Sequence, residues 1–157
     1  MSAKYETTNN QHPIDARLFQ IRALRDIPSI GVKAGDLGGY IENKGNLSQE
    51  GDCWVGIDAR IYGNAHVCDN AQVYDTAWVS GDARVSGSAY VAGDAWVKGD
   101  VILNENMEVT GIARIISMAQ IYYADGVTAY FDTNQELTVH GATTDIEHHK
   151  TLAKLKL

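Results

Sequence analysis

Aliphatic residues recur at every sixth position through the middle of the chain, and this period decides the predicted fold. The series starts at Val55 and reaches Ile121 without a break. Its members are Val55, Ile61, Val67, Val73, Val79, Val85, Val91, Val97, Leu103, Val109, Ile115 and Ile121. A β-strand alternates its two faces with period two, so aliphatic residues spaced by six can all point inward. The pattern therefore predicts a coil of short, stacked strands.

Two further series with the same period supply the corners of this coil. An alanine series runs Ala59, Ala65, Ala71, Ala77, Ala83, Ala89 and Ala95, lapses at Val101 and Met107, and resumes at Ala113 and Ala119. A glycine series comprises Gly63, Gly81, Gly87, Gly93, Gly99 and Gly111. Alanine is small enough for an inner corner, and glycine tolerates the backbone angles of a sharp turn. Three six-residue sides then close a triangular coil, and successive coils stack about 4.8 Å apart.

These spacings resemble the hexapeptide-repeat family, in which an aliphatic residue, two or three variable residues and a small residue alternate. The resemblance implies an all-β, single-domain, left-handed parallel β-helix. Spacing alone does not give the hand, because crossover connections are usually right-handed. Pentapeptide-repeat helices would need a period of five, which this chain lacks.

The two ends of the chain depart from the repeat. Weaker matches carry the six-residue register back to Leu37, and Arg17 to Leu24 alternates as a strand that we expect to cover the open end of the core. Thr144 and Glu147 have capping-box spacing, which predicts a short terminal helix. The predicted segments are a disordered N-terminus at 1–12, an N-terminal β cap with a degenerate first coil at 13–50, the β-helix at 51–141, and a C-terminal helix or tail at 142–157.

A second, narrower resemblance lies ahead of the repeat. The stretch from Val32 to Gly51 reads VKAGDLGGYIENKGNLSQEG and follows IRALRD. It resembles the N-terminal segment of a group of hexapeptide proteins, widespread in enterobacteria and prophages, that are named as transferases. The similarity covers about Arg17 to Gly99, beyond which the motif decays. It implies a phage or prophage setting, but these proteins are named by their fold rather than by a demonstrated reaction.

Composition narrows the classes of function. The formal net charge is −7, which gives no electrostatic footprint for binding nucleic acid or an anionic membrane. No apolar run approaches the roughly 18 residues of a membrane span, and the first residues lack the apolar core of a signal peptide. We therefore expect a cytoplasmic protein. Cys53 and Cys68 are too few for a disulfide framework, and we expect both to be reduced.

Sorting the outward residues by 18 predicts three faces on the triangular coil. The Gln/Tyr face consists of Trp54, Gln72, Tyr90 and Glu108 beside Gly56, Tyr74, Ala92 and Thr110. The Trp/Arg face consists of Arg60, Trp78, Trp96 and Arg114 beside Tyr62, Ser80, Lys98 and Ile116. The His/Cys face consists of His66, Arg84, Ile102 and Gln120 beside Cys68, Ser86, Asn104 and Tyr122.

The Trp/Arg face is the candidate interaction site. Trp78 and Trp96 occupy the same position in consecutive coils, so they should stack on each other between Arg60 and Arg114. Exposed tryptophan and arginine are typical anchors of protein interfaces. The face is interpreted as the contact of a homotrimer, or as a docking surface for a host macromolecule, another protein or a small ligand held between subunits. A third interpretation is a ladder that only stiffens the sheet.

His66 and Cys68 flank Val67 and should point the same way. A metal site or a thiol catalyst would need a third ligand or an activating partner, which the spacing does not supply, so no metal site is predicted. Turn chemistry explains the corner aspartates. These aspartates are Asp58, Asp82, Asp94 and Asp100.

Three classes of function remain, and the favoured one is a non-catalytic interaction protein without a cofactor. The alternative is a hexapeptide-type acyltransferase that uses coenzyme A, with His66 as the general base. Against it, no loop interrupts the coils between Val55 and Ile121, and no basic cluster would grip a phosphate. The third is a structural element whose coils stack end to end. Caps at the ends of the coil would oppose such stacking.

Overall fold

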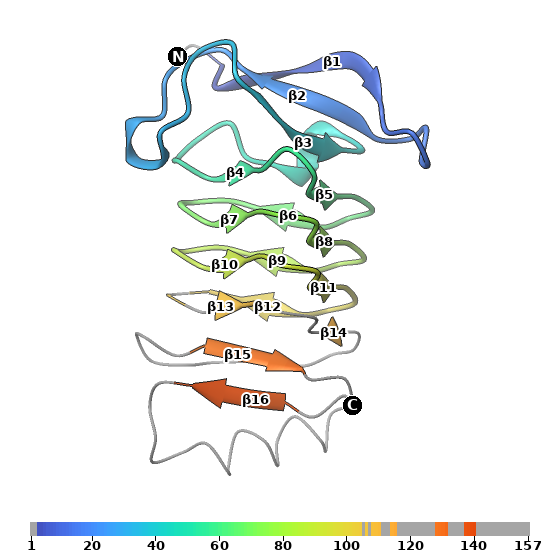
Figure 1. Ribbon diagram of the computed structural model, residues 1–157, viewed down its shortest axis with the longest axis vertical. Coiled ribbons are helices and arrows are strands. Elements are labelled where there is room, and N and C mark those ends of the chain that lie inside the picture. The colour runs from blue at the N-terminus through green and yellow to red at the C-terminus, as the bar shows by residue number, and fades with distance from the viewer. Residues whose placement is uncertain are drawn as a thin grey trace.

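Short parallel strands stack into a three-sided coil through the middle of the molecule (Figure 1). The structure is a computed structural model and describes residues 3–104, 106, 108–110, 114–115, 128–131 and 137–140. The coil strands are β4 (Trp54–Val55), β5 (Arg60–Ile61), β6 (His66–Val67), β7 (Gln72–Val73), β8 (Trp78–Val79), β9 (Arg84–Val85), β10 (Tyr90–Val91), β11 (Trp96–Val97), β12 (Ile102–Leu103), β13 (Glu108–Val109) and β14 (Arg114–Ile115). Each strand begins six residues after the previous one, as the aliphatic period predicts.

Each coil strand pairs in parallel with the strand that occupies the same side of the next coil. Val79, for example, lies opposite both Ile61 and Val97. Within the described residues the strands form three sheets, ordered β1-β2-β3-β5-β8-β11-β14, β16-β15-β13-β10-β7-β4 and β12-β9-β6. The prediction of an all-β, single-domain parallel solenoid is confirmed. The left hand of the coil stays a prediction from the resemblance.

The inward columns form one continuous apolar core. The aliphatic column from Val55 to Leu103 is fully buried, and the alanine column from Ala59 to Ala95 is buried beside it. Backbone bonds join the coils above and below, as where the N–H of Trp78 donates to Ala95 O at 2.9 Å. The repeat therefore encodes the core directly, because every sixth side chain enters it.

Left-handed backbone angles recur at the corners. Gly81 has a φ of 68°, and a Cβ there would lie 2.6 Å from the backbone nitrogen of Gly99 in the next coil. Asp69 and Asp75 take the same conformation at corners without glycine, with φ of 57° and 56°. Their carboxylates accept hydrogen bonds from backbone N–H groups of the next coil. The aspartates at these two corners thus help to form the turns. Aspartate tolerates the left-handed backbone conformation better than most residues.

An antiparallel cap covers the N-terminal end of the coil (Figure 1). It contains β1 (Tyr5–Gln11), β2 (Phe19–Ala23) and β3 (Leu37–Ile41), with short 3-10 helices η1 (Pro28–Ile30) and η2 (Lys44–Asn46) in its loops. The predicted disorder of residues 1–12 is wrong for Tyr5–Gln11, since β1 pairs along β2. Its sequence, YETTNNQ, is polar and gives no local signal; backbone pairing and the buried side chain of Tyr5 hold it in place.

The extension of the six-residue register back to Leu37 is also wrong. Leu37 is 44% exposed, whereas Ile41 and Leu47 are fully buried. Ile41 pairs with Ile61 and Leu47 with Val67, and the members of each pair lie two positions further apart in the chain than those of the regular coils. The first coil therefore holds two extra residues, which fall between Leu47 and Val55.

The other end of the coil closes with a change of strand direction. β15 (Thr128–Phe131) pairs in parallel with β13, and β16 (Leu137–His140) then pairs antiparallel with β15. The parallel helix predicted for 51–141 therefore stops before β16, because an antiparallel strand cannot continue the coil. The predicted helix at 142–157 lies outside the described residues. No helix in the described part of the chain is long and apolar enough to cross a membrane.

Candidate interaction face

The two tryptophans of the Trp/Arg face stack as predicted. Trp78 on β8 lies directly opposite Trp96 on β11. Their ring centroids are 4.6 Å apart and the ring planes differ by 5°. The parallel ladder dictates this distance, because it matches the spacing of adjacent strands. Both side chains are half-buried, so part of the stack remains accessible to solvent.

A cation lies over one end of the stack. The guanidinium carbon of Arg60 is 4.2 Å from the ring centroid of Trp78. Its Nε is shielded from solvent and has no hydrogen-bond acceptor in the described part of the chain. Arg114 continues the column beyond Trp96, since its backbone pairs with that residue. Among the described residues, neither Arg60 nor the exposed Lys98 forms a salt bridge, so their charges are not neutralised there.

A shallow depression of about 200 Å³ lies beside the aromatic stack. It is lined by Tyr62, Trp78, Ser80, Trp96 and Lys98. Aromatic rings line it together with the ammonium group of Lys98 and the buried Ser80. Such a surface suits a partner that presents an apolar group together with an acceptor or a negative charge.

The cap lengthens the aromatic column in a way the sequence analysis missed. Tyr40 on β3 lies opposite Arg60, and the ring of His12 packs edge-on against Tyr40 at 4.8 Å. The sort by 18 could not place Tyr40 in this column, because the first coil is two residues longer than the regular ones. The signal that could have found it is the six-residue step from Ile41 to Leu47, which defines the shifted register of the first coil.

The cap also brings a charged pair to the second column of the face. The Arg17 guanidinium lies 5.9 Å from the ring centroid of Tyr62 and binds both carboxylate oxygens of Asp15, at 3.0 and 2.7 Å. These hydrogen bonds lower the pKa of Asp15 to about 2. Desolvation, followed by the charge of Arg60, lowers the pKa of His12. The imidazole is thus biased toward its neutral form beside the positive column.

The Gln/Tyr face is more closely packed than its outward columns predict. Trp54 was expected to face solvent, but only 2% of it is exposed. A Cβ at Gly38 of β3 would lie 2.8 Å from the Trp54 ring, so the cap covers this tryptophan. Tyr74 lies so close above Gly56 that a Cβ there would come within 2.4 Å of its ring. This face offers no open aromatic stack like that of Trp78 and Trp96 within the described residues.

The His/Cys face holds His66 but assembles no catalytic group around it in the part of the chain that the structure describes. His66 Nδ1 lies 2.6 Å from Gly45 O, and since a carbonyl only accepts, Nδ1 carries the proton. The Nε2 of a neutral ring is then the free base. Cys68 is half-buried, and burial raises the pKa of its thiol. Among the described residues, no three His, Cys, Asp or Glu side chains gather where they could hold a metal ion.

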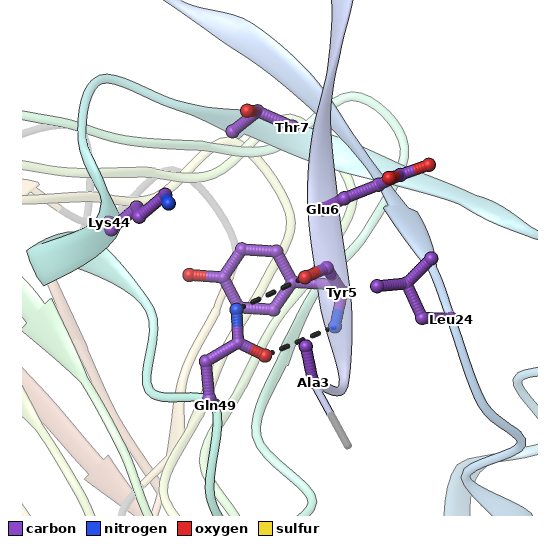
Figure 2. A pocket seen from close by; sticks show the side chains of 7 residues that line it. All are labelled: Ala3, Tyr5, Glu6, Thr7, Leu24, Lys44 and Gln49. Carbon is purple, nitrogen blue, oxygen red and sulfur yellow. Dashed lines mark hydrogen bonds between the residues drawn. The ribbon is translucent and has the colours of Figure 1, made fainter.

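A second hollow lies at the cap, where β1 meets the first coil (Figure 2). It has a volume of about 260 Å³ and is lined by Ala3, Tyr5, Glu6, Thr7, Leu24, Lys44 and Gln49. Gln49 accepts from the backbone N–H of Tyr5 at 3.2 Å and donates to its carbonyl at 3.1 Å. The side-chain amide thereby imitates a neighbouring strand, which makes this hollow part of the attachment of β1.

Within the described residues, the structure is a parallel β-solenoid whose Trp/Arg face combines a tryptophan stack with cationic side chains. Compared with the models of known protein families and with the curated proteins, the chain matches no family model and no curated protein at significance.

Proposed function

We propose that the protein is a non-catalytic binding module whose Trp/Arg face docks an acidic surface of another protein. The observation that carries the proposal is the half-exposed stack of Trp78 on Trp96, beside two cations that form no salt bridge within the described residues. A stack that only stiffened the sheet would need neither Lys98 nor the adjoining depression. Tryptophan and arginine are among the residues most enriched in the dominant contacts of protein interfaces.

Charge supports a partner that is acidic. Arg60 and Lys98 lie on the same face, and neither forms a salt bridge among the described residues, so a carboxylate of the partner could pair with either cation. An arginine held against an aromatic ring has already lost part of its side-chain freedom. Binding a carboxylate therefore costs less conformational entropy than it would for a free side chain.

A foreign partner fits this face better than a second copy of the chain. In the described outward columns of the other two faces, the sole acidic residue is Glu108. The remaining aspartates of the described coils lie at the corners, where Asp69 and Asp75 bind backbone N–H groups. These columns therefore offer the chain's own Trp/Arg face no complementary row of carboxylates. The prophage resemblance would make the partner a protein of the host.

A homotrimer forms part of the proposal, with subunit contacts that leave the Trp/Arg face open to its partner. It is supported by the resemblance to hexapeptide-repeat proteins, which commonly form trimers. Light scattering should give the mass of three chains for the wild-type protein and for a Trp78→Ala/Trp96→Ala double variant. A wild-type monomer would refute the trimer. A double variant that alone became monomeric would show that the tryptophans are a subunit contact.

The binding claim is tested by native mass spectrometry of the protein isolated from the cells in which it is naturally made. Wild-type protein should retain an acidic protein that high salt releases, since exposed ion pairs are screened. The Trp78→Ala/Trp96→Ala variant should lose that protein, while Arg84→Ala, the equivalent position on the His/Cys face, should keep it. An unloaded wild-type chain, or a partner retained by the double variant, would refute the docking role.

A second candidate function has one observation in its favour. The bond from His66 Nδ1 to Gly45 O leaves Nε2 as the basic nitrogen, which is the arrangement an acyltransferase base would need. In that case coenzyme A should stay bound through native mass spectrometry and leave on denaturation. His66→Ala should then abolish acyl transfer while the fold persists. If His66→Ala leaves function unchanged, the catalytic candidate is removed.

A further inference from the structure

A lysine and a cysteine meet in the closed interior between the cap and the first coil. The side chains of Lys4 and Cys53 are both fully buried. The Nζ of Lys4 lies 3.1 Å from the Sγ of Cys53 and 2.7 Å from its carbonyl oxygen. This pair lies apart from the Trp/Arg face and takes no part in the proposed docking.

The position of Gly51 and Cys53 in the first coil explains why a lysine is buried here. Backbone bonds between coils run from an N–H to a carbonyl of the following coil, as from Cys53 to Asp69 O, so the carbonyls of Gly51 and Cys53 have no preceding coil to donate to them. Lys4 Nζ donates to the carbonyls of Gly51 and Cys53, at 3.2 and 2.7 Å. A buried ammonium group is tolerated only when it is well bonded, and these bonds hold Nζ beside the sulfur.

The backbone around Lys4 is also held in place. Its N–H donates to Gln49 Oε1 at 2.7 Å, and the same oxygen accepts from the N–H of Tyr5, as Figure 2 shows for the latter bond. The Tyr5 hydroxyl donates to Leu47 O at 2.6 Å. The amine and the thiol therefore lie on two segments that are fixed relative to each other, and a reaction between them needs little rearrangement.

We propose that Lys4 and Cys53 form a covalent nitrogen–sulfur bond when the protein is exposed to hydrogen peroxide. Peroxide first oxidises the Cys53 thiol to a sulfenic acid and is itself reduced to water. The neutral amine of Lys4 then attacks the sulfur, the N–S bond forms, and the sulfenic oxygen leaves as a second water with one proton from the amine. Overall, the thiol and the amine each lose one hydrogen, and one peroxide becomes two waters.

Burial makes the first step slow and the second step selective. Desolvation lowers the pKa of the Lys4 ammonium and raises the pKa of the Cys53 thiol, and the attraction between the two groups partly opposes both changes. Less thiolate means slower oxidation, whereas more neutral amine means a better nucleophile. Once formed, the sulfenic acid is shielded from solvent thiols, and the Lys4 amine is the nucleophile beside it.

The bond would tie the cap to the coil across 49 residues of chain. β1 would then be unable to separate from the first coil without unfolding the corner that contains Cys53. A link across a loop of this length restricts the unfolded chain and stabilises the cap. The link is reversible once the corner opens, because thiols that reach the sulfenamide reduce it to a free cysteine and a free amine.

The test uses the chain with Cys68→Ser, which removes the half-buried second thiol and with it any disulfide to Cys53. The protein is treated with hydrogen peroxide, digested with a protease that does not cut at lysine, and analysed by mass spectrometry. We expect one linked peptide pair that joins Lys4 to Cys53, lighter than its two free peptides by two hydrogens. Treatment with excess thiol should restore the free peptides.

Two matched variants locate the bond. Lys4→Arg keeps the positive charge over the carbonyls but replaces the amine with a guanidinium, which remains protonated, so the linked pair should disappear. Cys53→Ala should also abolish it. A Cys53 that is oxidised without a link to Lys4 would refute the proposal. So would a free Cys53 thiol at a peroxide dose that fully oxidises Cys68 in the wild-type chain.

Discussion

The Trp/Arg face and the His/Cys face are built on the same coil, six residues apart, yet their described outward residues differ in chemistry. Trp78, Val79 and Ser80 on the first correspond to Arg84, Val85 and Ser86 on the second. The valines are equally buried, whereas a tryptophan on one face is replaced by an arginine on the other. The inward columns thus determine the fold, and the outward columns are free to carry a function.

This separation explains why the outward residues of one face can differ from those of another without changing the packing of the core. The ladder aligns Trp78 with Trp96 whatever their chemistry, because the same backbone bonds align Arg84 with Ile102. Because the repeat places every eighteenth side chain in one column, two tryptophans that are 18 residues apart form a continuous stack.

The largest expected effect breaks both faces together. Val79→Asp places a carboxylate in the apolar column shared by the three sheets, and we expect it to lower the free energy of unfolding by more than about 4 kcal/mol. Denaturant unfolding followed by circular dichroism measures the loss. A cost near zero would mean that the inward column is not a closed core.

The next effect acts at the corner between the two faces. Gly81→Val adds a branched Cβ at a φ of 68° against Gly99, and we expect a cost of about 2–4 kcal/mol in unfolding free energy. Gly81→Asp should cost less, because Asp69 and Asp75 occupy equivalent corners and bond the next coil. Equal costs for the two variants would contradict this account of the corners.

A smaller effect separates the stability of the aromatic stack from its function. Trp78→Ala/Trp96→Ala removes the ring stack and the contact of Trp78 with Arg60, and should lower the unfolding free energy by about 1–2 kcal/mol. Arg84→Ala, at the exposed equivalent position, should change it by less than about 0.5 kcal/mol. A loss as large as that of Val79→Asp would assign the tryptophans to the core.

The smallest effect concerns the His/Cys face. His66→Ala removes the hydrogen bond to Gly45 O, and the expected cost in unfolding free energy is about 1 kcal/mol. Partner binding should be unchanged in the native mass measurement. Loss of binding with the fold intact would extend the functional surface to this second face.

The regular coils were predictable from the sequence because their period is local and repeated. The inward columns, the glycine corners and the Trp78–Trp96 stack all follow from counting by six and by 18. The cap was not predictable in this way: β1 is polar, and it is held by bonds to β2 and to Gln49. Such contacts join segments far apart in the chain, and no local pattern marks them.

In the candidate site, too, the positions set by the repeat were predictable and those set by the cap or by a loop were not. Arg60, Tyr62, Trp78 and Lys98 lie together as the columns predict, while the exposure assigned to Trp54 was wrong because the cap lies over it. Tyr40 was missed because two extra residues in the first coil shift its register. The bond from His66 to Gly45 depends on η2, a loop element that the repeat does not specify.

Site-specific photo-crosslinking inside cells tests the central claim most directly. A photoreactive amino acid is placed at Lys98 on the Trp/Arg face, or at Asn104, its equivalent on the His/Cys face. The account predicts a crosslink to an acidic protein from position 98, which is lost with Trp78→Ala/Trp96→Ala, and no such crosslink from position 104. Crosslinks to the same protein from both positions, or from position 104 alone, would contradict it.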